Sequence, residues 1–205
     1  KIEAPNSLGW FYSAFTEFFG FTAYDGEYKL MGLASYGQKN IKLRKKILKV
    51  LYYNEAENTY NLNPYFIHYG LHSWSARFTD KLIDLIGIPP LNKTNKYKRI
   101  YYDLAFEVQY ALENIVCKLV SYYMPTYKQA NLCIGGGVGL NIKMNTALYN
   151  LDCVKDIYIH PLCFDGGSST SSAQIADFQI TKSNPKKITN LFLGKDYKSK
   201  EVKDI

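Results

Sequence analysis

The sequence predicts an α/β fold. Apolar residues recur at three- and four-residue intervals over residues 103–123, which indicates a long amphipathic helix. Two short apolar runs, 132–134 and 157–159, are each followed by turn-forming residues, as buried strands are. A second helical pattern over 140–149 separates these runs. Helices alternating with short apolar strands favour a structure of packed helix and sheet layers.

Turn residues and apolar spacing define the other elements. Ser7 is the expected N-cap of a helix over 8–19 that ends at Gly20. Because this helix is apolar nearly all round, we expect it to be buried between layers. The further expectations are a loop over 24–37, a helix over 41–53, strands or a hairpin over 60–69, a short helix over 78–86 that stops at Gly87, and a strand over 191–193.

Composition limits the class of protein. The 205 residues, 47% of them hydrophobic, suffice for one large domain or two small ones. The net charge of +7 is concentrated in 39–49, 93–99 and 182–203, and we interpret it as a solvated face because no RNA-binding signature accompanies it. No apolar run reaches the length of a bilayer span, so we expect a cytoplasmic protein without a membrane partner. Because the RNA-binding signature is missing, we also expect no nucleic-acid partner. Since the chain does not begin with methionine, we expect it to be a piece of a longer protein.

Cysteine and histidine spacing gives no metal site. The four cysteines contain no C-x-x-C pair, and Cys133 and Cys163 lie in apolar runs, so we expect buried, reduced thiols. His68 and His72 have the spacing of a helical metal pair. However, Gly70 lies between them, and two incidental histidines in a loop or strand are the better interpretation. We expect His160, next to Pro161, to be structural or to support the site rather than to be catalytic, but its closeness to Asp165 leaves a catalytic role open.

Two glycine turns follow the predicted strands. Gly135, Gly136 and Gly137 follow the first strand, and Asp165 with two further glycines follows the second. The first turn has neither the spacing of a dinucleotide-binding fingerprint nor the lysine of a Walker A loop. From the glycines alone, a tight structural turn and a ligand site are equally good interpretations.

Glu27 and Lys29 lie in the glycine-containing segment 24–37. In an extended segment, side chains two residues apart point the same way. A carboxylate beside an ammonium group suits a ribose hydroxyl and a phosphate. An exposed ion pair of little energetic value is the alternative, and the residues alone leave it open.

Several of these stretches together resemble the NodU/CmcH-type O-carbamoyltransferase family. The resemblance extends from about Ser7 to Gly194 and departs from the family pattern at Ser35 and at the serines over 168–172. We expect those serines still to cap the last helix. The matching stretches are Ser7-Leu-Gly-Trp-Phe-Tyr-Ser-Ala-Phe-Thr, Gly26-Glu-Tyr-Lys-Leu-Met-Gly-Leu-Ala, Asp103-Leu-Ala with Gln109 and Glu113, Asn131-Leu-Cys-Ile-Gly-Gly-Gly-Val-Gly-Leu-Asn141, and Pro161 with Asp165-Gly-Gly.

The resemblance implies a fold and a domain organisation. It implies that residues 1–194 are the C-terminal lobe of a domain with the actin-like ATPase and sugar-kinase (ribonuclease H-like) fold, a mixed sheet flanked by helices. Residues 195–205 would then be a charged tail leading to a YrdC-like domain. The N-terminal lobe and that domain would be the missing partners, with a homodimer as a further expectation.

The resemblance also implies an activity and site residues. The family makes carbamoyl-adenylate from carbamoyl phosphate and ATP and passes the carbamoyl group to a hydroxyl of a sugar or natural product. A metal, usually iron, polarises the carbonyl. The family's histidine ligands belong to a segment upstream, so this chain alone is expected to hold no metal tightly and to have no turnover. The implied nucleotide contacts are Glu27, Lys29, Gly136, Gly137 and Asn141, the implied metal ligand is Asp165, and no catalytic side chain is assigned.

Two other functions remain open. One is a protein of the type that synthesises threonylcarbamoyl-adenosine on tRNA, which shares the implied fold and carbamoyl-adenylate chemistry. The basic segments favour it, whereas the Gly-Glu-Tyr-Lys-Leu-Met-Gly-Leu-Ala stretch favours the small-molecule transferases. The other is a non-catalytic nucleotide-binding or assembly lobe that partners another chain.

Overall fold

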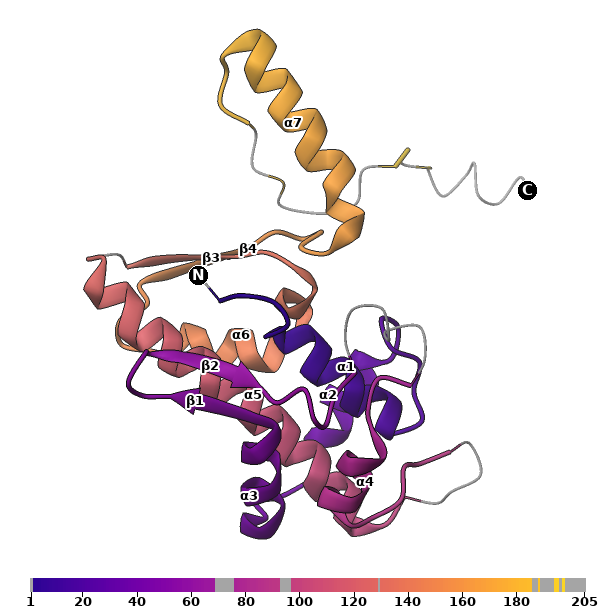
Figure 1. The fold of residues 1–205 in the computed structure, drawn as a ribbon. Coiled ribbons are helices and arrows are strands. Elements are labelled where there is room, and N and C mark those ends of the chain that lie inside the picture. Colours follow the sequence, from indigo (N-terminus) through magenta and orange to yellow (C-terminus); the bar gives the residue numbers. More distant parts are fainter. Residues whose placement is uncertain are drawn as a thin grey trace.

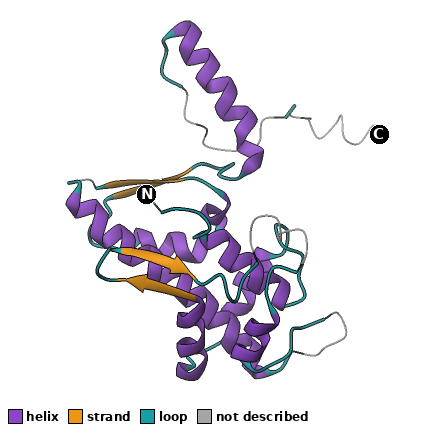
Figure 2. Cartoon of the chain, viewed as in Figure 1, coloured by secondary structure: helices purple, strands orange, loops and turns teal. Residues whose placement is uncertain are grey.

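A computed structural model describes residues 2–68, 76–92, 97–128, 130–185, 188, 194, 195 and 197 (Figures 1 and 2). Over residues 99–181, helices and short strands alternate, as the sequence predicts. The helices are α1 (Leu8–Phe18), α2 (Glu27–Ala34), α3 (Ile41–Val50), α4 (Asp80–Ile86), α5 (Arg99–Thr126), α6 (Ile142–Tyr149) and α7 (Ser168–Thr181). The strands are β1 (Leu51–Asn54), β2 (Thr59–Leu62), β3 (Asn131–Ile134) and β4 (Asp156–Ile159), and single 3₁₀ turns cover Gly137–Leu140 and Asp165–Gly167.

Helix α5 is the centre of the packing. It contacts α1, α2, α3 and α6 and runs behind strands β1 and β2 in Figure 1. Leu104, Val108 and Leu112 of its apolar stripe are at most 1% exposed. The helix is longer at both ends than the predicted span 103–123. Apolar burial on this scale is the main stabilising contribution to such a core.

Helix α1 is buried as its composition predicts. Ser7 caps it, with the Oγ atom accepting a hydrogen bond from the Trp10 backbone N–H. Phe11, Phe15 and Phe18 are fully buried, and the rings of Phe11 and Phe15 meet edge to face at 5.3 Å between centroids. Aromatic side chains of this size bury large areas and suit a helix enclosed on several sides.

The four strands form two separate sheets rather than the single mixed sheet that the resemblance implies. Strands β1 and β2 pair antiparallel, with Leu51 opposite Leu62. Strands β3 and β4 pair parallel, with Ile134 opposite Ile159. The inward side chains Leu132 and Ile157 pack against the core, while Asn131 and Asp156 are exposed, so β3 and β4 are covered on one face.

Segment 24–37 is not the loop that the sequence predicts. Its glycines suggested a loop, but residues Glu27–Ala34 form helix α2, whose Leu30 and Ala34 are buried. The apolar contacts with α5 outweigh the weak helix propensity of Gly32, which costs about 1 kcal/mol relative to alanine in a helix interior.

Two further boundaries differ from the predictions. Helix α3 ends at Val50, and residues 51–54 turn into strand β1 because Tyr52 and Tyr53 suit a strand and pair with β2. Helix α4 begins at Asp80, two residues later than predicted, and ends as predicted with Gly87 in the left-handed conformation. The predicted strand over 191–193 lies outside the described residues, as does most of the tail over 195–205.

Helix α7 stands away from the other helices, on the far side of the β3–β4 sheet (Figure 1). Its N-cap is Gly167, without a side-chain capping hydrogen bond, so the prediction that the serines cap this helix is wrong. None of its residues is buried among the described residues, and Ile175, Phe178 and Ile180 are exposed. No helix in the described part of the chain is both long enough and apolar enough to cross a membrane.

The cysteines are free, as expected, but they are not all buried. Cys163 is buried, Cys117 and Cys153 are half-buried, and Cys133 is exposed on the outer face of β3. The prediction that Cys133 is buried is wrong, because alternate residues of a strand with one covered face point outward.

A buried ion pair fixes α3 against α5. The Glu107 carboxylate, with its side chain fully buried, accepts hydrogen bonds from Arg44 Nε at 2.6 Å and from the Asn40 backbone N–H at 2.6 Å. The guanidinium of Arg44 also covers the ring of Tyr110, 3.5 Å from its centroid.

We predict that Glu107→Ala lowers the free energy of unfolding by about 3–5 kcal/mol, because it leaves a guanidinium and a backbone N–H without their partner. Glu55→Ala, which breaks the exposed pair with Lys118, should change it by at most about 1 kcal/mol. Urea unfolding of the two variants beside the unmodified chain measures both. Equal losses in the two variants would contradict the role given to Glu107.

Candidate functional site

The connections that follow the two strands of the parallel sheet lie close to each other. Ile134 and Ile159 are opposite each other at the carboxyl ends of β3 and β4, and a glycine turn follows each strand. A Cβ atom built on Gly139 would lie 3.1 Å from Cys163 Sγ, so the two connections touch. The carboxyl ends of parallel strands are where ligands bind in α/β proteins.

The turn over 135–137 is open on its outer side. A Cβ atom built on Gly135, Gly136 or Gly137 would meet nothing within 4 Å. Only Gly136 needs glycine for its conformation, with φ 87° and ψ 158°. Neither close packing nor a left-handed φ explains glycine at 135 and 137. Open space at the backbone is compatible with close approach of a ligand.

Asn141 is buried at the end of this turn and begins helix α6. Its Oδ1 atom caps the helix by accepting a hydrogen bond from the Met144 backbone N–H at 2.9 Å. Its amide also pairs with that of Gln109 in both directions, at 2.9 Å and 3.0 Å. Asn141 is therefore held from inside the protein, by α5.

Gln109 connects this amide pair to two further helix residues. The Tyr12 hydroxyl donates to Gln109 Oε1 at 2.7 Å, and Gln109 Nε2 donates to Glu113 Oε1 at 2.7 Å. Burial raises the pKa of the Tyr12 hydroxyl, and the nearby carboxylates of Glu113 and Glu27 raise it further. The hydroxyl therefore stays protonated near neutral pH and acts as a donor.

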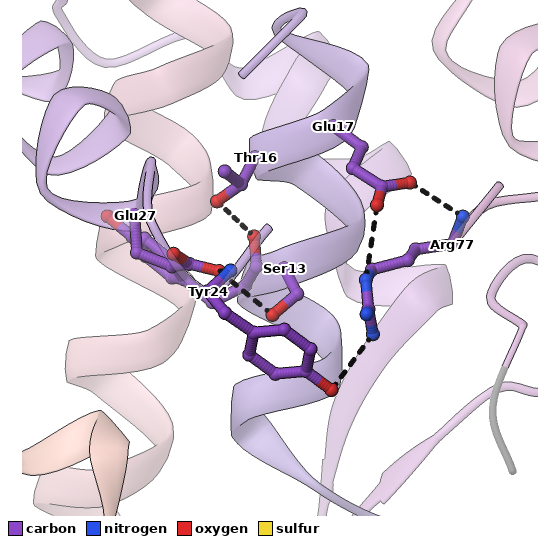
Figure 3. Close-up of polar contacts among 7 residues, drawn as sticks. Ser13, Thr16, Glu17, Tyr24, Glu27 and Arg77 are labelled. Carbon is purple, nitrogen blue, oxygen red and sulfur yellow. Dashed lines mark hydrogen bonds and ion pairs between the residues drawn. The ribbon is translucent and has the colours of Figure 1, made fainter. Parts of the chain in front are cut away.

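Glu27 is turned inward at the start of α2 (Figure 3). Its Oε1 atom accepts hydrogen bonds from Ser13 Oγ at 3.0 Å and from the Tyr24 backbone N–H at 2.8 Å. Tyr24 has a positive φ of 69°, and its ring lies against the guanidinium of Arg77 at 4.3 Å. The Tyr24 hydroxyl accepts from Arg77, which also pairs with Glu17 at 3.1 Å.

Lys29 does not lie beside Glu27, contrary to the prediction for an extended segment. On helix α2, two residues correspond to a rotation of about 200°, so the two side chains leave from different sides. The Lys29 ammonium is exposed and lies 5.7 Å from the ring centroid of Phe21 and 5.5 Å from that of Tyr28. The structure therefore separates these two side chains.

Two consecutive residues of α1 link this helix to two of the predicted nucleotide contacts, Glu27 and Asn141. Ser13 binds Glu27, while Tyr12 reaches Asn141 through Gln109. Sequence reasoning gave no role to Tyr12 or Ser13, because both lie within an otherwise apolar helix. The only signal was that a tyrosine hydroxyl and a serine interrupt a helix predicted to be buried, where polar groups need partners.

Asp165 begins the 3₁₀ turn after β4 and is exposed. Within the described ranges, no group of three or more His, Cys, Asp or Glu side chains could hold a metal ion. His160 Nδ1 accepts a hydrogen bond from the Leu162 backbone N–H at 3.0 Å, which agrees with a structural role. His68 lies in an extended segment bonded to Arg77, and His72 lies outside the described residues.

Comparison with known proteins identifies relatives over nearly the whole chain. The family model described as Carbamoyltransferase N-terminus matches residues 1–174. An uncharacterized protein of Synechocystis is 32% identical over 209 residues, 98% of this chain and 33% of that protein. Nodulation protein NolO of Bradyrhizobium diazoefficiens is 25% identical over 207 residues, 98% of this chain and 34% of that protein.

Another relative matches a shorter stretch of the chain at higher sequence identity. Nodulation protein U of Azorhizobium caulinodans is 46% identical over 43 residues, which cover 21% of this chain and 8% of that protein. The chain spans about one third of the length of the Synechocystis protein and of NolO.

We predict that the three glycines of the open turn differ in their importance for stability. Gly135→Ala and Gly137→Ala should change the free energy of unfolding by less than about 0.5 kcal/mol, because the added methyl group meets open space. Gly136→Ala should lower it by about 1–3 kcal/mol, since its backbone angles are almost restricted to glycine. Urea unfolding measures all three, and a large loss at 135 or 137 would mean that the turn is packed rather than open.

Proposed function

The chain belongs to the carbamoyltransferase N-terminus family, and from that premise we propose that it is part of an O-carbamoyltransferase. The proposed reaction transfers a carbamoyl group from carbamoyl-adenylate to a hydroxyl of a sugar or natural product. The observation that carries the proposal is the open glycine turn at the carboxyl ends of β3 and β4, held from inside by Asn141. The match to the family over residues 1–174 supports the reaction class.

In this proposal the described site is the adenosine side of the carbamoyl-adenylate site. The backbone at Gly136 and Gly137 lies against the nucleotide, because no side chain there prevents close approach. Asn141 fixes the end of that turn through its buried amide. Lys29, exposed on α2, provides a positive charge for the phosphate, and Glu27 accepts a ribose hydroxyl in addition to its bonds with Ser13 and Tyr24.

The proposed step is a substitution at the carbamoyl carbon. The acceptor hydroxyl oxygen forms a bond to this carbon, the bond between the carbon and the phosphate oxygen of AMP breaks, and AMP leaves with that electron pair. The hydroxyl proton passes to solvent or to a base outside the described residues. Carbamoyl phosphate and ATP supply the adenylate. These co-substrates are intracellular metabolites, so the proposal places the protein in the cytoplasm.

We further propose the actin-like ATPase fold with its C-terminal lobe over residues 1–194. The proposal includes an N-terminal lobe and a YrdC-like domain, both outside this chain. It also includes a homodimer. The chain covers about one third of the Synechocystis relative, which leaves room for both additional parts in a protein of that length. The parallel pair β3–β4 is the element of the described structure that suits such a lobe.

Iron is proposed for the whole protein, with Asp165 as one ligand. The residues of this chain do not fit iron by themselves, because Asp165 is one exposed carboxylate and the described residues contain no cluster of three ligands. The chain's own contribution would be to present that carboxylate from the turn after β4.

One alternative is synthesis of threonylcarbamoyl-adenosine on tRNA, which the exposed lysines of α3 favour. A filter-binding assay with tRNA at increasing salt separates the two proposals. A specific complex that weakens steeply as salt rises would favour the tRNA reaction. The second alternative is a non-catalytic nucleotide-binding or assembly lobe that partners another chain. Such a lobe would bind ATP, but neither it nor its complex with that chain would transfer a carbamoyl group.

We predict that AMP and ATP bind at the open turn. Gly137→Val should weaken their affinity at least about tenfold without loss of folding, because the new side chain occupies the space of the ligand. Gly194→Val, which adds the same side chain in the C-terminal segment, is the matched control. Isothermal titration calorimetry measures both, and unchanged affinity in Gly137→Val would remove the turn from the proposed site.

We predict that the chain alone, loaded with Fe(II) and desalted, retains less than about one tenth of an equivalent of iron, since a metal site needs several ligands. In a longer protein that contains this chain and binds iron, Asp165→Asn should reduce the iron content, whereas Asp177→Asn on α7 should leave it unchanged. Elemental analysis decides both points. Stoichiometric iron in the chain alone would contradict the proposed division of ligands.

A further inference from the structure

The side-chain amide of Gln109 uses its full hydrogen-bonding capacity. Its Oε1 atom accepts from the Tyr12 hydroxyl at 2.7 Å and from Asn141 Nδ2 at 3.0 Å. Its Nε2 atom donates to Asn141 Oδ1 at 2.9 Å and to Glu113 Oε1 at 2.7 Å. A primary amide offers two donor hydrogens and two acceptor lone pairs, so no capacity remains.

This arrangement allows only one orientation of the Gln109 amide. An ionised Glu113 carboxylate accepts hydrogen bonds and donates none, so Gln109 Nε2 must face it. Turning the amide over would place Gln109 Oε1 against the carboxylate and leave buried groups unpaired. Since Gln109 is 2% exposed, no bulk water replaces the lost partners.

The orientation of Gln109 sets that of Asn141. With Gln109 Nε2 fixed, Asn141 Oδ1 must face it, and the same oxygen then caps α6 at Met144. The Asn141 backbone N–H donates to the Val138 carbonyl at 3.0 Å, and the Gly139 N–H donates to the Gly136 carbonyl at 2.9 Å. A continuous series of hydrogen bonds therefore runs from α5 to the open turn.

We propose that Tyr12 and Gln109 are positioning residues of the nucleotide site, which hold the Asn141 amide, and through it the glycine turn, in the arrangement that receives the ligand. Neither side chain touches the ligand. Their contribution is to remove the alternative orientations of Asn141 before the ligand binds, which lowers the ordering cost of binding. This inference rests on the proposed function, because the ligand is the adenine nucleotide proposed for the turn.

The test compares two buried tyrosine hydroxyls. Tyr12→Phe removes the bond to Gln109, and Tyr60→Phe removes a bond of Tyr60 to the Asn6 carbonyl at 3.0 Å, outside this network. Tyr60 is 7% exposed and Tyr12 is 4% exposed, so the two changes have similar costs for folding. Gln109→Glu is a second variant, because a carboxylate at 109 cannot donate to Glu113 or Asn141.

Two measurements are made on each variant of the chain. AMP affinity is measured by titration calorimetry, and amide hydrogen exchange is measured at Gly139 and Met144. We expect Tyr12→Phe and Gln109→Glu to weaken AMP binding about fivefold or more and to speed exchange at both amides. Tyr60→Phe should lower the melting temperature as Tyr12→Phe does and leave affinity and exchange unchanged.

The outcomes separate this inference from the proposed function. Equal AMP affinity and equal exchange in Tyr12→Phe and Tyr60→Phe would overturn the positioning role. Absence of AMP binding in the unmodified chain would count against the proposed nucleotide site, and exchange would then still decide whether Tyr12 and Gln109 hold the turn. Faster exchange with unchanged affinity would also overturn the inference, since the turn would then not need this support to bind.

Discussion

The hydrogen bonds of the Gln109 amide are the constraint on which the rest of the site depends. They join α1, α5 and α6 at one buried point, through Tyr12 and Asn141. Packing of apolar side chains tolerates small displacements of one helix against another, whereas hydrogen bonds do not. A displacement that breaks them leaves buried polar groups unpaired, and each such group costs about 1–3 kcal/mol. The network thus fixes the helix arrangement within a narrow range, and the turn after β3 takes its position from it.

The elements that the sequence predicts well are those whose local signals agree with their environment. Helix α1 combines a serine cap with uniform apolarity, and the centre of α5 has a regular stripe that the structure buries. Gly87 ends α4 in the left-handed conformation. In each case propensity, capping and burial indicate the same structure, as is expected for a sequence that folds with little internal conflict. The sequence predicts strands β3 and β4 to within one residue of their observed bounds, but not that they pair parallel.

The elements that the sequence predicts poorly are those decided by contacts distant along the chain. Helix α2 contains Gly32, yet it forms because Leu30 and Ala34 pack on α5. That single error also misplaced Lys29, since the expectation that it lies beside Glu27 assumed an extended backbone. The sequence gives no indication that Ser13 is the hydrogen-bond partner of Glu27, because fourteen positions and a change of helix separate them. Linear spacing carries no information about such pairs.

The two walls of the candidate site are supported unequally. The glycine turn is held by a buried network, and its outer surface is open. The turn of Asp165 rests on local hydrogen bonds, such as that from the Gly167 N–H to the Phe164 carbonyl, and continues into α7, which has no buried residue among those described. An exposed side chain such as that of Asp165 loses conformational entropy when a ligand fixes it. Binding at the glycine turn, as proposed, would therefore carry little ordering cost, whereas a ligand of Asp165 would also have to offset the cost of fixing that side chain.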